Sequence, residues 1–379
     1  MPNLGPNQNL IDVPGSRHAL TTPALVLDLD AFERNLANHA RSCGEAGIRL
    51  RPHAKTHKCS EIAKRQIEAG AVSVCCATLH EATVMVNAGI SGVLISSPIV
   101  GGAKVNRLIE LNKKAEKLMI VADNRSNIAD ISNTAERENT ELDVLIDIDI
   151  GMQRTGIHNL EEIVALAAMI EKCANLTYRG VQAYSGRVQH IENYLDREKE
   201  YGAQLDHLVA VLEALNKANL KPAIISGGGT GTHAIDHQRK IFTEHQTGSY
   251  IFMDVEYNEV ELSQNAPSPF QTSLFMQCSV VSNNADGFVT IDGGYKCFAT
   301  DGPKPEVATE SLPGALYDRF GDEHGKIILG ENCQKPAIGT SIILITPHCD
   351  PTVNLHNYLH CIRGDKLIDI WPIDARGVL

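Results

Sequence analysis

Aromatic residues and positive charge are both scarce in this chain. Phe, Trp and Tyr make up 5% of its 379 residues, with a single Trp, so aliphatic side chains must fill the core. Lys and Arg number 34 against 46 Asp and Glu, which leaves a formal net charge of −12 at pH 7. This acidic balance argues against a nucleic acid or an anionic membrane as a partner.

Other absences narrow the class of protein further. No apolar run reaches the roughly 18 residues that a membrane-spanning helix needs. Residues 1–23 are polar and rich in Pro and Gly, unlike a secretory signal peptide, and we expect them to form an arm. The ten cysteines are scattered and include no CxxC pair, which excludes a zinc ribbon and a small disulfide framework. We therefore expect a cytoplasmic enzyme with reduced thiols.

From residue 24 onward, short β-branched runs alternate with longer amphipathic runs. Apolar residues recur at three- and four-residue spacing in the predicted helices, such as 159–175 and 198–219. Such alternation is typical of parallel strands covered by helices. Strands are predicted at 24–30, 48–54, 72–78, 92–97, 118–123, 142–150, 178–184, 222–228 and 248–254.

The strands between residues 48 and 254 match the number that a (β/α)8 barrel of the TIM type requires. The run at 24–30 is then left outside the barrel. A doubly wound open sheet is the alternative, but no GxGxxG motif opens the first strand–helix turn. After about residue 260 clear helices stop, and short alternating runs separated by Gly, Pro, Asn and Asp predict a C-terminal antiparallel β domain.

Polar residues collect where the predicted barrel strands end. Lys55, in "RPHAKTHK", follows the first barrel strand, Arg154 follows the fifth, and Tyr184 ends the sixth. "SGGGTGT" (226–232) follows the seventh strand, and "TGSY" (247–250) opens the eighth. Active sites of such barrels lie at the carboxyl ends of the strands. The glycine loop can offer backbone N–H groups to a phosphate, although a flexible turn has the same composition.

Lys55 is surrounded in sequence by other basic side chains, Arg51, His53, His57 and Lys58. Neighbouring cations lower the pKa of an amine, and a neutral amine can form a Schiff base with an aldehyde. An aldehyde cofactor that carries a phosphate would use both Lys55 and the glycine loop, and that cofactor is pyridoxal phosphate. The alternative is that Lys55 is a solvated surface charge.

A third pattern is "PHCDPTVNLHN" at 347–357. On a strand, His348 and Asp350 would point the same way while Cys349 points to the other face. An imidazole beside a carboxylate is a ligand set that suits Mn²⁺ or Mg²⁺, whereas a thiolate-rich ligand set would favour zinc. A hydrogen-bonded His–Asp pair without metal has the same spacing.

Taken together, these motifs resemble those of the D-threonine aldolases, within the D-serine dehydratase-like group of alanine-racemase-fold enzymes. The resemblance runs from about residue 21 to 377 and is carried by "TPALVLDLDAFERNL", "RPHAKTHK", "VQAYSGRVQH", "SGGGTGT", "GSYIFMD", "DEHG", "HCDPTVNLH" and "WPIDARG". It implies a fold-type-III pyridoxal phosphate enzyme that forms a homodimer. In this fold the first strand joins the β domain, which divides the chain into an arm and strand (1–30), a barrel (31–258) and a β domain (259–379).

The resemblance also implies roles for individual residues. Lys55 becomes the Schiff-base lysine, and His348 and Asp350 become the ligands of the metal, Mn²⁺ or Mg²⁺. The dehydratase branch is expected to carry His-x-Cys at this position, so Asp350 favours assignment of the chain to the aldolase branch. The residues expected to hold or border the coenzyme are Arg154, Tyr184, Gly228, Gly229, Thr230, Gly248, Ser249 and Tyr257.

The activity that the resemblance implies is retro-aldol cleavage of a D-β-hydroxy-α-amino acid of the D-threonine type, giving glycine and an aldehyde. His190 is our candidate for the catalytic base. Ala77 stands where the aldolases usually carry a glutamine. Arg187 stands where a small or apolar residue is usual, and it either meets the second carboxylate of D-3-hydroxyaspartate or is a surface charge.

Three other activities stay open at this point. A metal-dependent dehydratase of D-serine or D-hydroxyaspartate would use the same coenzyme and release a keto acid and ammonia. A racemase would need a second base, to which no sequence feature clearly points. A non-catalytic carrier of pyridoxal phosphate would have no use for a metal pair.

Overall fold

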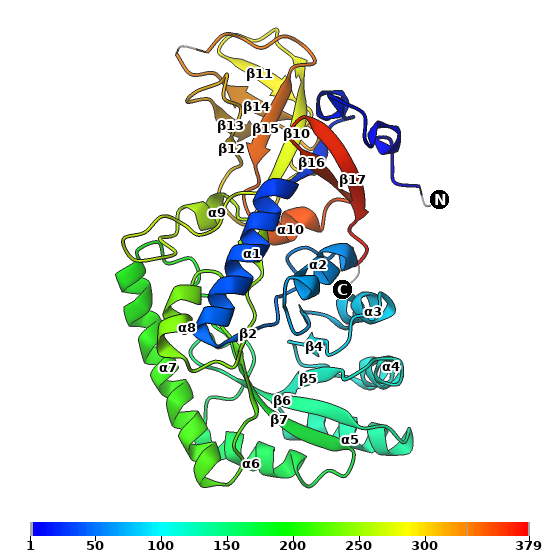
Figure 1. Cartoon of the computed structure of the whole chain (residues 1–379), viewed down its shortest axis with the longest axis vertical. Coiled ribbons are helices and arrows are strands. Elements are labelled where there is room, and N and C mark those ends of the chain that lie inside the picture. The colour runs from blue at the N-terminus through cyan, green and yellow to red at the C-terminus, as the bar shows by residue number, and fades with distance from the viewer. Residues whose placement is uncertain (1–2, 332, 378–379) are drawn as a thin grey trace.

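The computed structural model describes residues 3–331 and 333–377, which form two units stacked along the long axis of the molecule (Figure 1). The lower unit is an eight-stranded parallel sheet with helices around it, and the upper unit is a nine-stranded mixed sheet. This arrangement confirms the predicted fold class, a (β/α)8-type barrel followed by a largely antiparallel β domain.

The parallel sheet runs in the order β2-β9-β8-β7-β6-β5-β4-β3. A parallel bridge between His53 and Cys75 joins its two edges, just beyond β2 and at the start of β3. The sheet therefore closes on itself. Its strands are β2 (Arg49–Leu50), β3 (Cys75–Cys76), β4 (Leu94–Ile95), β5 (Met119–Ala122), β6 (Leu142–Ile148), β7 (Leu176–Ala183), β8 (Ile224–Gly227) and β9 (Glu244–His245).

Helices cover the outside of this sheet. They are α1 (Leu29–Ala46), α2 (Ser60–Glu68), α3 (Leu79–Asn87), α4 (Gly102–Asn112), α5 (Arg125–Arg137), α6 (Leu160–Ile170), α7 (Tyr194–Lys217) and α8 (His233–Arg239). The helices predicted at 159–175 and 198–219 correspond to α6 and α7. Strand residues are buried on both faces, as in β5, because the helices cover one face and the barrel interior the other. Among the described residues, no helix combines the length and the apolarity needed to cross a membrane.

The second sheet runs in the order β13-β14-β11-β10-β1-β16-β17, and β15 pairs with both β10 and β12. β1 (Ala24–Asp28) pairs antiparallel with β10 and parallel with β16, so this early strand lies in the middle of a late domain. The other strands are β10 (Leu274–Ser282), β11 (Phe288–Ile291), β12 (Glu306–Val307), β13 (Leu316–Arg319), β14 (Gly325–Ile328), β15 (Ser341–Ile345), β16 (Tyr358–Arg363) and β17 (Lys366–Pro372).

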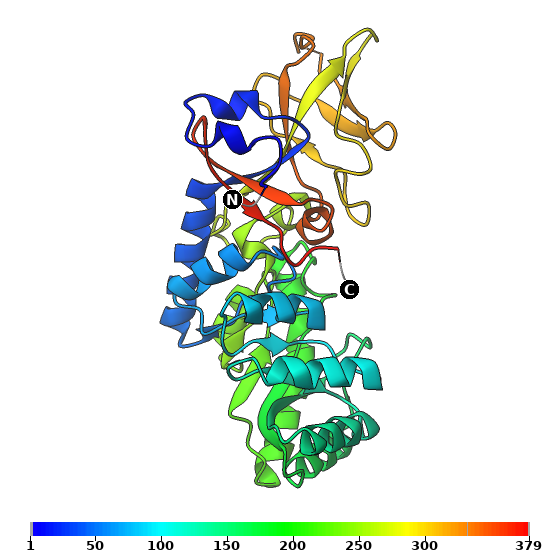
Figure 2. The same cartoon turned by 90° about the vertical axis from the view of Figure 1, so that its right-hand side faces the viewer.

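Short segments complete the two units. The N-terminal arm contains the 3-10 turns η1 (Gln8–Leu10) and η2 (Ser16–Ala19) and packs against the hairpin of β16 and β17 (Figure 2). It is held there by the Asp12 N–H, which donates to the Leu367 carbonyl at 2.8 Å. The helices α9 (Val255–Asn258) and α10 (Cys349–Val353) lie near the junction of the two units (Figure 1).

The strand predicted at 248–254 is wrong. The eighth barrel strand is β9, which precedes it, and Ser249–Ile251 form a 3-10 turn, η3. The Tyr250 N–H donates to the Thr230 hydroxyl at 3.1 Å instead of to a neighbouring strand. The apolar run Tyr250–Met253 is buried in the core beneath the second sheet. Periodicity cannot separate a short buried strand from a buried turn, which explains the error.

Candidate active site

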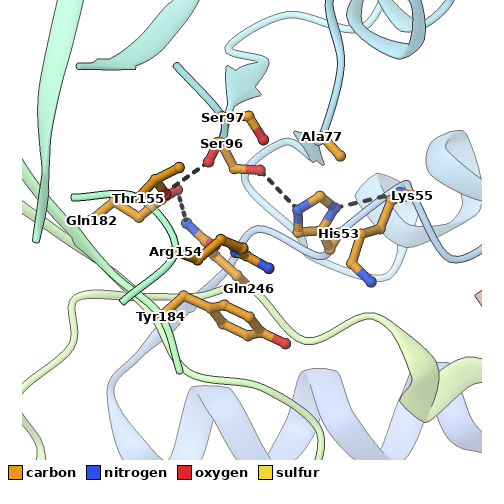
Figure 3. Close-up of a pocket in the computed structure, with 10 residues that line it drawn as sticks. All are labelled: His53, Lys55, Ala77, Ser96, Ser97, Arg154, Thr155, Gln182, Tyr184 and Gln246. Carbon is orange, nitrogen blue, oxygen red and sulfur yellow. Dashed lines mark hydrogen bonds between the residues drawn. The ribbon is translucent and has the colours of Figure 1, made fainter. Parts of the chain in front are cut away.

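A cavity of about 330 Å³ lies at the carboxyl ends of the barrel strands (Figure 3). Lys55 follows β2, Arg154 follows β6 and Tyr184 follows β7, so the closed barrel brings three predicted residues to one cavity. The full lining consists of His53, Lys55, Ala77, Ser96, Ser97, Arg154, Thr155, Gln182, Tyr184 and Gln246.

Lys55 connects the two units of the protein. Its Nζ donates a hydrogen bond to Asp350 Oδ2, a residue of α10 that lies 295 positions further along the chain. The Lys55 side chain is 40% exposed and that of Asp350 is 12% exposed. Burial opposes the charge on Lys55, but the Asp350 carboxylate outweighs it and raises the Lys55 pKa. Burial likewise disfavours the Asp350 carboxylate, but Lys55 and His348 lower its pKa below the usual range.

The other basic residues of "RPHAKTHK" either form ion pairs with carboxylates or are uncharged. Arg51 forms a buried two-pronged ion pair with Glu244, at 2.7 and 2.9 Å. Lys58 pairs with Glu81. Burial lowers the pKa of His53 to about 3 and that of His57 to about 4, so neither ring carries charge at neutral pH.

The prediction that neighbouring cations lower the pKa of Lys55 is therefore wrong. The flanking charges are compensated by their own partners, and the nearest group to the amine is a carboxylate. The contact with Asp350 therefore favours the protonated form of Lys55.

The candidate metal ligands do not lie on a strand as predicted. His348 is the residue before α10, and Asp350 lies in the first turn of that helix. The His348 Nδ1 lies 2.9 Å from Asp301 Oδ2. Pro351 follows Asp350 and suits the first turn of a helix, where its missing N–H is not needed.

Asp254 fixes the position of α10 relative to the barrel. One carboxylate oxygen accepts the Cys349 N–H at 2.8 Å, and the other accepts the Tyr257 N–H at 2.9 Å. Burial raises the Asp254 pKa to about 6. The residue lies in the "GSYIFMD" motif, but its role was not predicted because its second partner is 95 positions away.

His190 lies beside the same group of residues. Its ring centroid is 4.7 Å from that of Tyr257, and its Nδ1 is 3.4 Å from Glu256 Oε1. Burial lowers the His190 pKa, the Glu256 carboxylate opposes this, and the neighbouring His348 adds to the lowering. Neither His190 nor Tyr257 lines the cavity, but Lys55 and Asp350 are both among the charged groups that act on His190.

The glycine loop after β8 and the turn after β9 contact one another through Thr230 and Tyr250. A Cβ on Gly248 would lie 2.4 Å from Thr56 Oγ1, and one on Gly228, where φ is +69°, would lie 2.3 Å from His245 Nε2. These glycines are therefore required by close packing, beyond what a flexible turn would need. Within the described residues, the backbone N–H groups of Gly228, Thr230, Gly248 and Ser249 donate no hydrogen bond. Gly229 differs, because its N–H donates to the Thr232 hydroxyl at 3.1 Å.

A polar network in the cavity was missed by sequence reasoning. Asp147 accepts hydrogen bonds from Gln182 at 2.9 Å and from Thr155 at 2.7 Å, and Gln246 donates to Gln182 at 3.1 Å. Burial raises the Asp147 pKa to about 6. A signal for this network was present, because Asp147 and Gln182 are polar residues inside otherwise apolar strand runs.

The two positions at which the chain departs from the aldolase pattern differ in location. Ala77 lines the cavity, where its small side chain leaves space. Arg187 is exposed and is not among the lining residues. The structure therefore gives Arg187 the place of a surface charge.

Residues 27–256 match the family model described as the N-terminal domain of alanine racemase, and residues 273–362 match a putative serine dehydratase domain. The chain belongs to the alanine racemase N-terminal domain family. Within this family it is 36% identical to a D-threonine aldolase of Arthrobacter sp., over 94% of this chain and 93% of that protein. It is 33% identical to a 3-hydroxy-D-aspartate aldolase of Paracoccus denitrificans, over 94% of this chain and 92% of that protein.

Solved structures agree with this family membership. The D-threonine aldolase of Filomicrobium marinum superposes with a TM-score of 0.89 at 36% identity, covering 95% of this chain and 96% of that one. A D-threo-3-hydroxyaspartate dehydratase of Delftia sp. HT23 has a TM-score of 0.83 at 22% identity, covering 94% and 98%, and shows the shared fold. The resemblance to D-threonine aldolases that the motifs predicted is confirmed.

Proposed function

We propose that this protein cleaves a D-β-hydroxy-α-amino acid of the D-threonine type into glycine and an aldehyde, with pyridoxal phosphate and a divalent metal. The observation that carries the proposal is the contact between Lys55 and Asp350. It brings the amine that would hold the coenzyme and one of the two candidate metal ligands to the same place. The similarity to two aldolases over 94% of the chain supports it.

The residues present fit pyridoxal phosphate. Lys55 is a reachable amine in a cavity of about 330 Å³, within the usual size of small-molecule sites. The free N–H groups of the glycine loop and of Gly248 and Ser249 suit a phosphate, with Thr230 between them. When bound, the coenzyme would supply an electron sink for the carbanion left by bond cleavage. Gly228, Gly229, Arg154, Tyr184 and Tyr257 complete the proposed coenzyme site.

The residues present also fit a divalent metal. His348 and Asp350 provide one imidazole and one carboxylate, a donor set that suits Mn²⁺ or Mg²⁺ with water or substrate oxygens in the remaining positions. When bound, the metal would supply Lewis acidity toward the substrate β-hydroxyl. Asp301, which contacts His348 Nδ1, would fix the orientation of that imidazole.

Two side chains would then move protons. The Lys55 ammonium must lose a proton before it can react with an aldehyde, and the Asp350 carboxylate, which raises the Lys55 pKa, opposes this loss. His190 would accept the proton of the substrate β-hydroxyl, because its lowered pKa keeps the ring neutral at pH 7.

A second candidate substrate is D-3-hydroxyaspartate, whose cleavage would give glycine and glyoxylate. The cavity lining includes the guanidinium of Arg154, a cation suited to a second carboxylate, which lies 5.7 Å from the ring centroid of Tyr184.

A homodimer and a cytoplasmic location remain part of the proposal. All ten cysteines are free thiols, which suits a reducing compartment.

The test is a product assay on the purified protein with pyridoxal phosphate and Mn²⁺. D-threonine and D-3-hydroxyaspartate are offered separately, each with its L-form as control, with and without EDTA. Glycine formed from a D-form, and only with metal, is the expected result and ranks the two substrates. Ammonia and a keto acid in place of glycine would move the protein to the dehydratases, and loss of chirality alone would make it a racemase.

The role of Lys55 has its own test. Lys55→Ala should abolish both turnover and the visible absorbance of the bound coenzyme. Retention of both would contradict the assignment of Lys55.

A further inference from the structure

A second cluster of metal-binding side chains lies outside the cavity, between α1, α8 and β9. Cys43 Sγ lies 3.7 Å from His39 Nε2 and 3.7 Å from His237 Nε2. Donor atoms of His39, Cys43 and His245 all lie within 4.8 Å of one another. Cys43, His39 and His245 are buried, and His237 is partly exposed at the rim.

Local structure explains how this cluster forms. His39 and Cys43 are four residues apart on α1, so they share one face of the helix. His237 lies on α8, and His245 ends the short strand β9. Helix α1 thus contributes two donors, and elements about 200 residues later contribute the other two.

Each histidine uses one ring nitrogen for an outer hydrogen bond. His245 Nε2 lies 2.8 Å from Asp236 Oδ2, and His237 Nδ1 lies 3.1 Å from the Ser42 hydroxyl. His39 Nε2 lies 2.7 Å from the Thr247 hydroxyl, which leaves its Nδ1 free, 4.0 Å from the Cys43 sulfur. Such partners are what orient metal-binding histidines, because they fix the tautomer and the ring.

One ring nitrogen of this cluster, Nδ1 of His245, is buried without a hydrogen-bond partner among the described residues. A buried polar atom without a partner is destabilising. His233, which packs against the ring of His39, differs because its Nδ1 lies 2.9 Å from the Thr230 carbonyl and is satisfied.

We propose that His39, Cys43, His237 and His245 bind a zinc ion with a structural role. Zn–S and Zn–N bonds of about 2.3 and 2.0 Å at a tetrahedral angle place sulfur and nitrogen about 3.5 Å apart. The separation of 3.7 Å between Cys43 Sγ and His237 Nε2 is close to this value, and the free Nδ1 of His39 lies slightly further from the sulfur, at 4.0 Å. Binding releases the thiol proton of Cys43 to solvent, and the Cys43 thiolate with the Asp236 carboxylate then balances the charge of the ion.

The position of this site suggests what it stabilises. Thr247 directly precedes Gly248, and Asp236 accepts a hydrogen bond from Thr232 at 2.8 Å, at the end of the glycine loop. The ion would fasten α1 and α8 behind the two segments that carry the free N–H groups. This inference does not depend on the proposed reaction.

The test measures zinc in protein whose active-site pair is removed by His348→Ala and Asp350→Ala. We expect about one zinc per chain to remain after dialysis. Replacement by Co²⁺ should give the absorption of a tetrahedral thiolate complex. Cys43→Ser should remove this absorption and Cys173→Ser, at another free thiol, should leave it unchanged. Ser42→Ala, a mild change on α1, should weaken zinc binding by about 10-fold or more.

Two results would overturn the proposal. One is that this background protein keeps no zinc after dialysis and binds none on titration with zinc chloride. The other is that bound Co²⁺ shows no thiolate absorption or that Cys43→Ser leaves it unchanged. Neither result depends on whether the aldolase assay succeeds.

Discussion

The buried ion pair between Arg51 and Glu244 should be a main support of the closed barrel. Arg51 directly follows β2 and Glu244 opens β9, so the pair joins the first and last barrel strands in sequence. The Arg51 side chain is 6% exposed and that of Glu244 is fully buried. Arg51→Met would leave the carboxylate with only the half-exposed Arg49, at 3.3 Å, as a partner. We expect a loss of about 3–5 kcal/mol in the free energy of unfolding, as for other broken buried pairs.

The assay is chemical denaturation of the wild type, Arg51→Met, Glu244→Leu and the double variant at pH 7. The double variant should lose less than either single variant, because it leaves no unpaired buried charge. Arg363→Met is the matched control, since Arg363 pairs with surface carboxylates and should change the free energy of unfolding by less than about 1 kcal/mol. Additive losses in the double variant would refute the reasoning.

Three further predictions concern packing and protonation. Gly180→Ala should prevent soluble folding, because its Cβ would lie 1.9 Å from the Ile224 carbonyl oxygen. Gly44→Ala in α1 is the control, since its Cβ meets nothing within 4 Å, and it should raise the free energy of unfolding by about 0.5–1 kcal/mol. Soluble yield and thermal unfolding measure the effects of both substitutions. Because the folded state holds the Asp147 proton more tightly than the unfolded state, the wild type should lose stability relative to Asp147→Asn as pH rises from 3.8 to about 6, in denaturation series at several pH values. His190→Gln should lower kcat about 10²–10⁴-fold, and the acidic limb of the wild-type kcat/KM profile should lie below pH 6.5.

The sequence was sufficient to predict the barrel because its signals are repeated. Strand–helix alternation, with apolar runs of the right length, occurs along most of the chain, and each strand–helix pair indicates the same parallel, helix-covered sheet. The same topology predicted that Lys55, Arg154 and Tyr184 would meet, because the carboxyl ends of parallel strands lie at one end of a barrel.

Local sequence patterns gave wrong predictions where contacts with residues distant in the sequence determine charge state or backbone conformation. The charge state of Lys55 depends on Asp350 in the other unit, and the charge of Arg51 is compensated by Glu244, so reading "RPHAKTHK" alone overestimated the positive charge. The spacing of His348 and Asp350 suggested a strand, but the chain turns into α10 there, held by the distant Asp254. These contacts are properties of tertiary structure, which a single sequence does not display.

The most direct test of the proposed reaction is metal-dependent glycine release by Asp350→Asn. The variant keeps the size of the side chain but removes the charge that contacts Lys55 and would bind the metal. We predict that it retains the visible absorbance of pyridoxal phosphate yet releases glycine from the preferred D-substrate at least 100-fold more slowly than the wild type at equal Mn²⁺. Wild-type glycine release by Asp350→Asn, with the same dependence on Mn²⁺, would contradict the account.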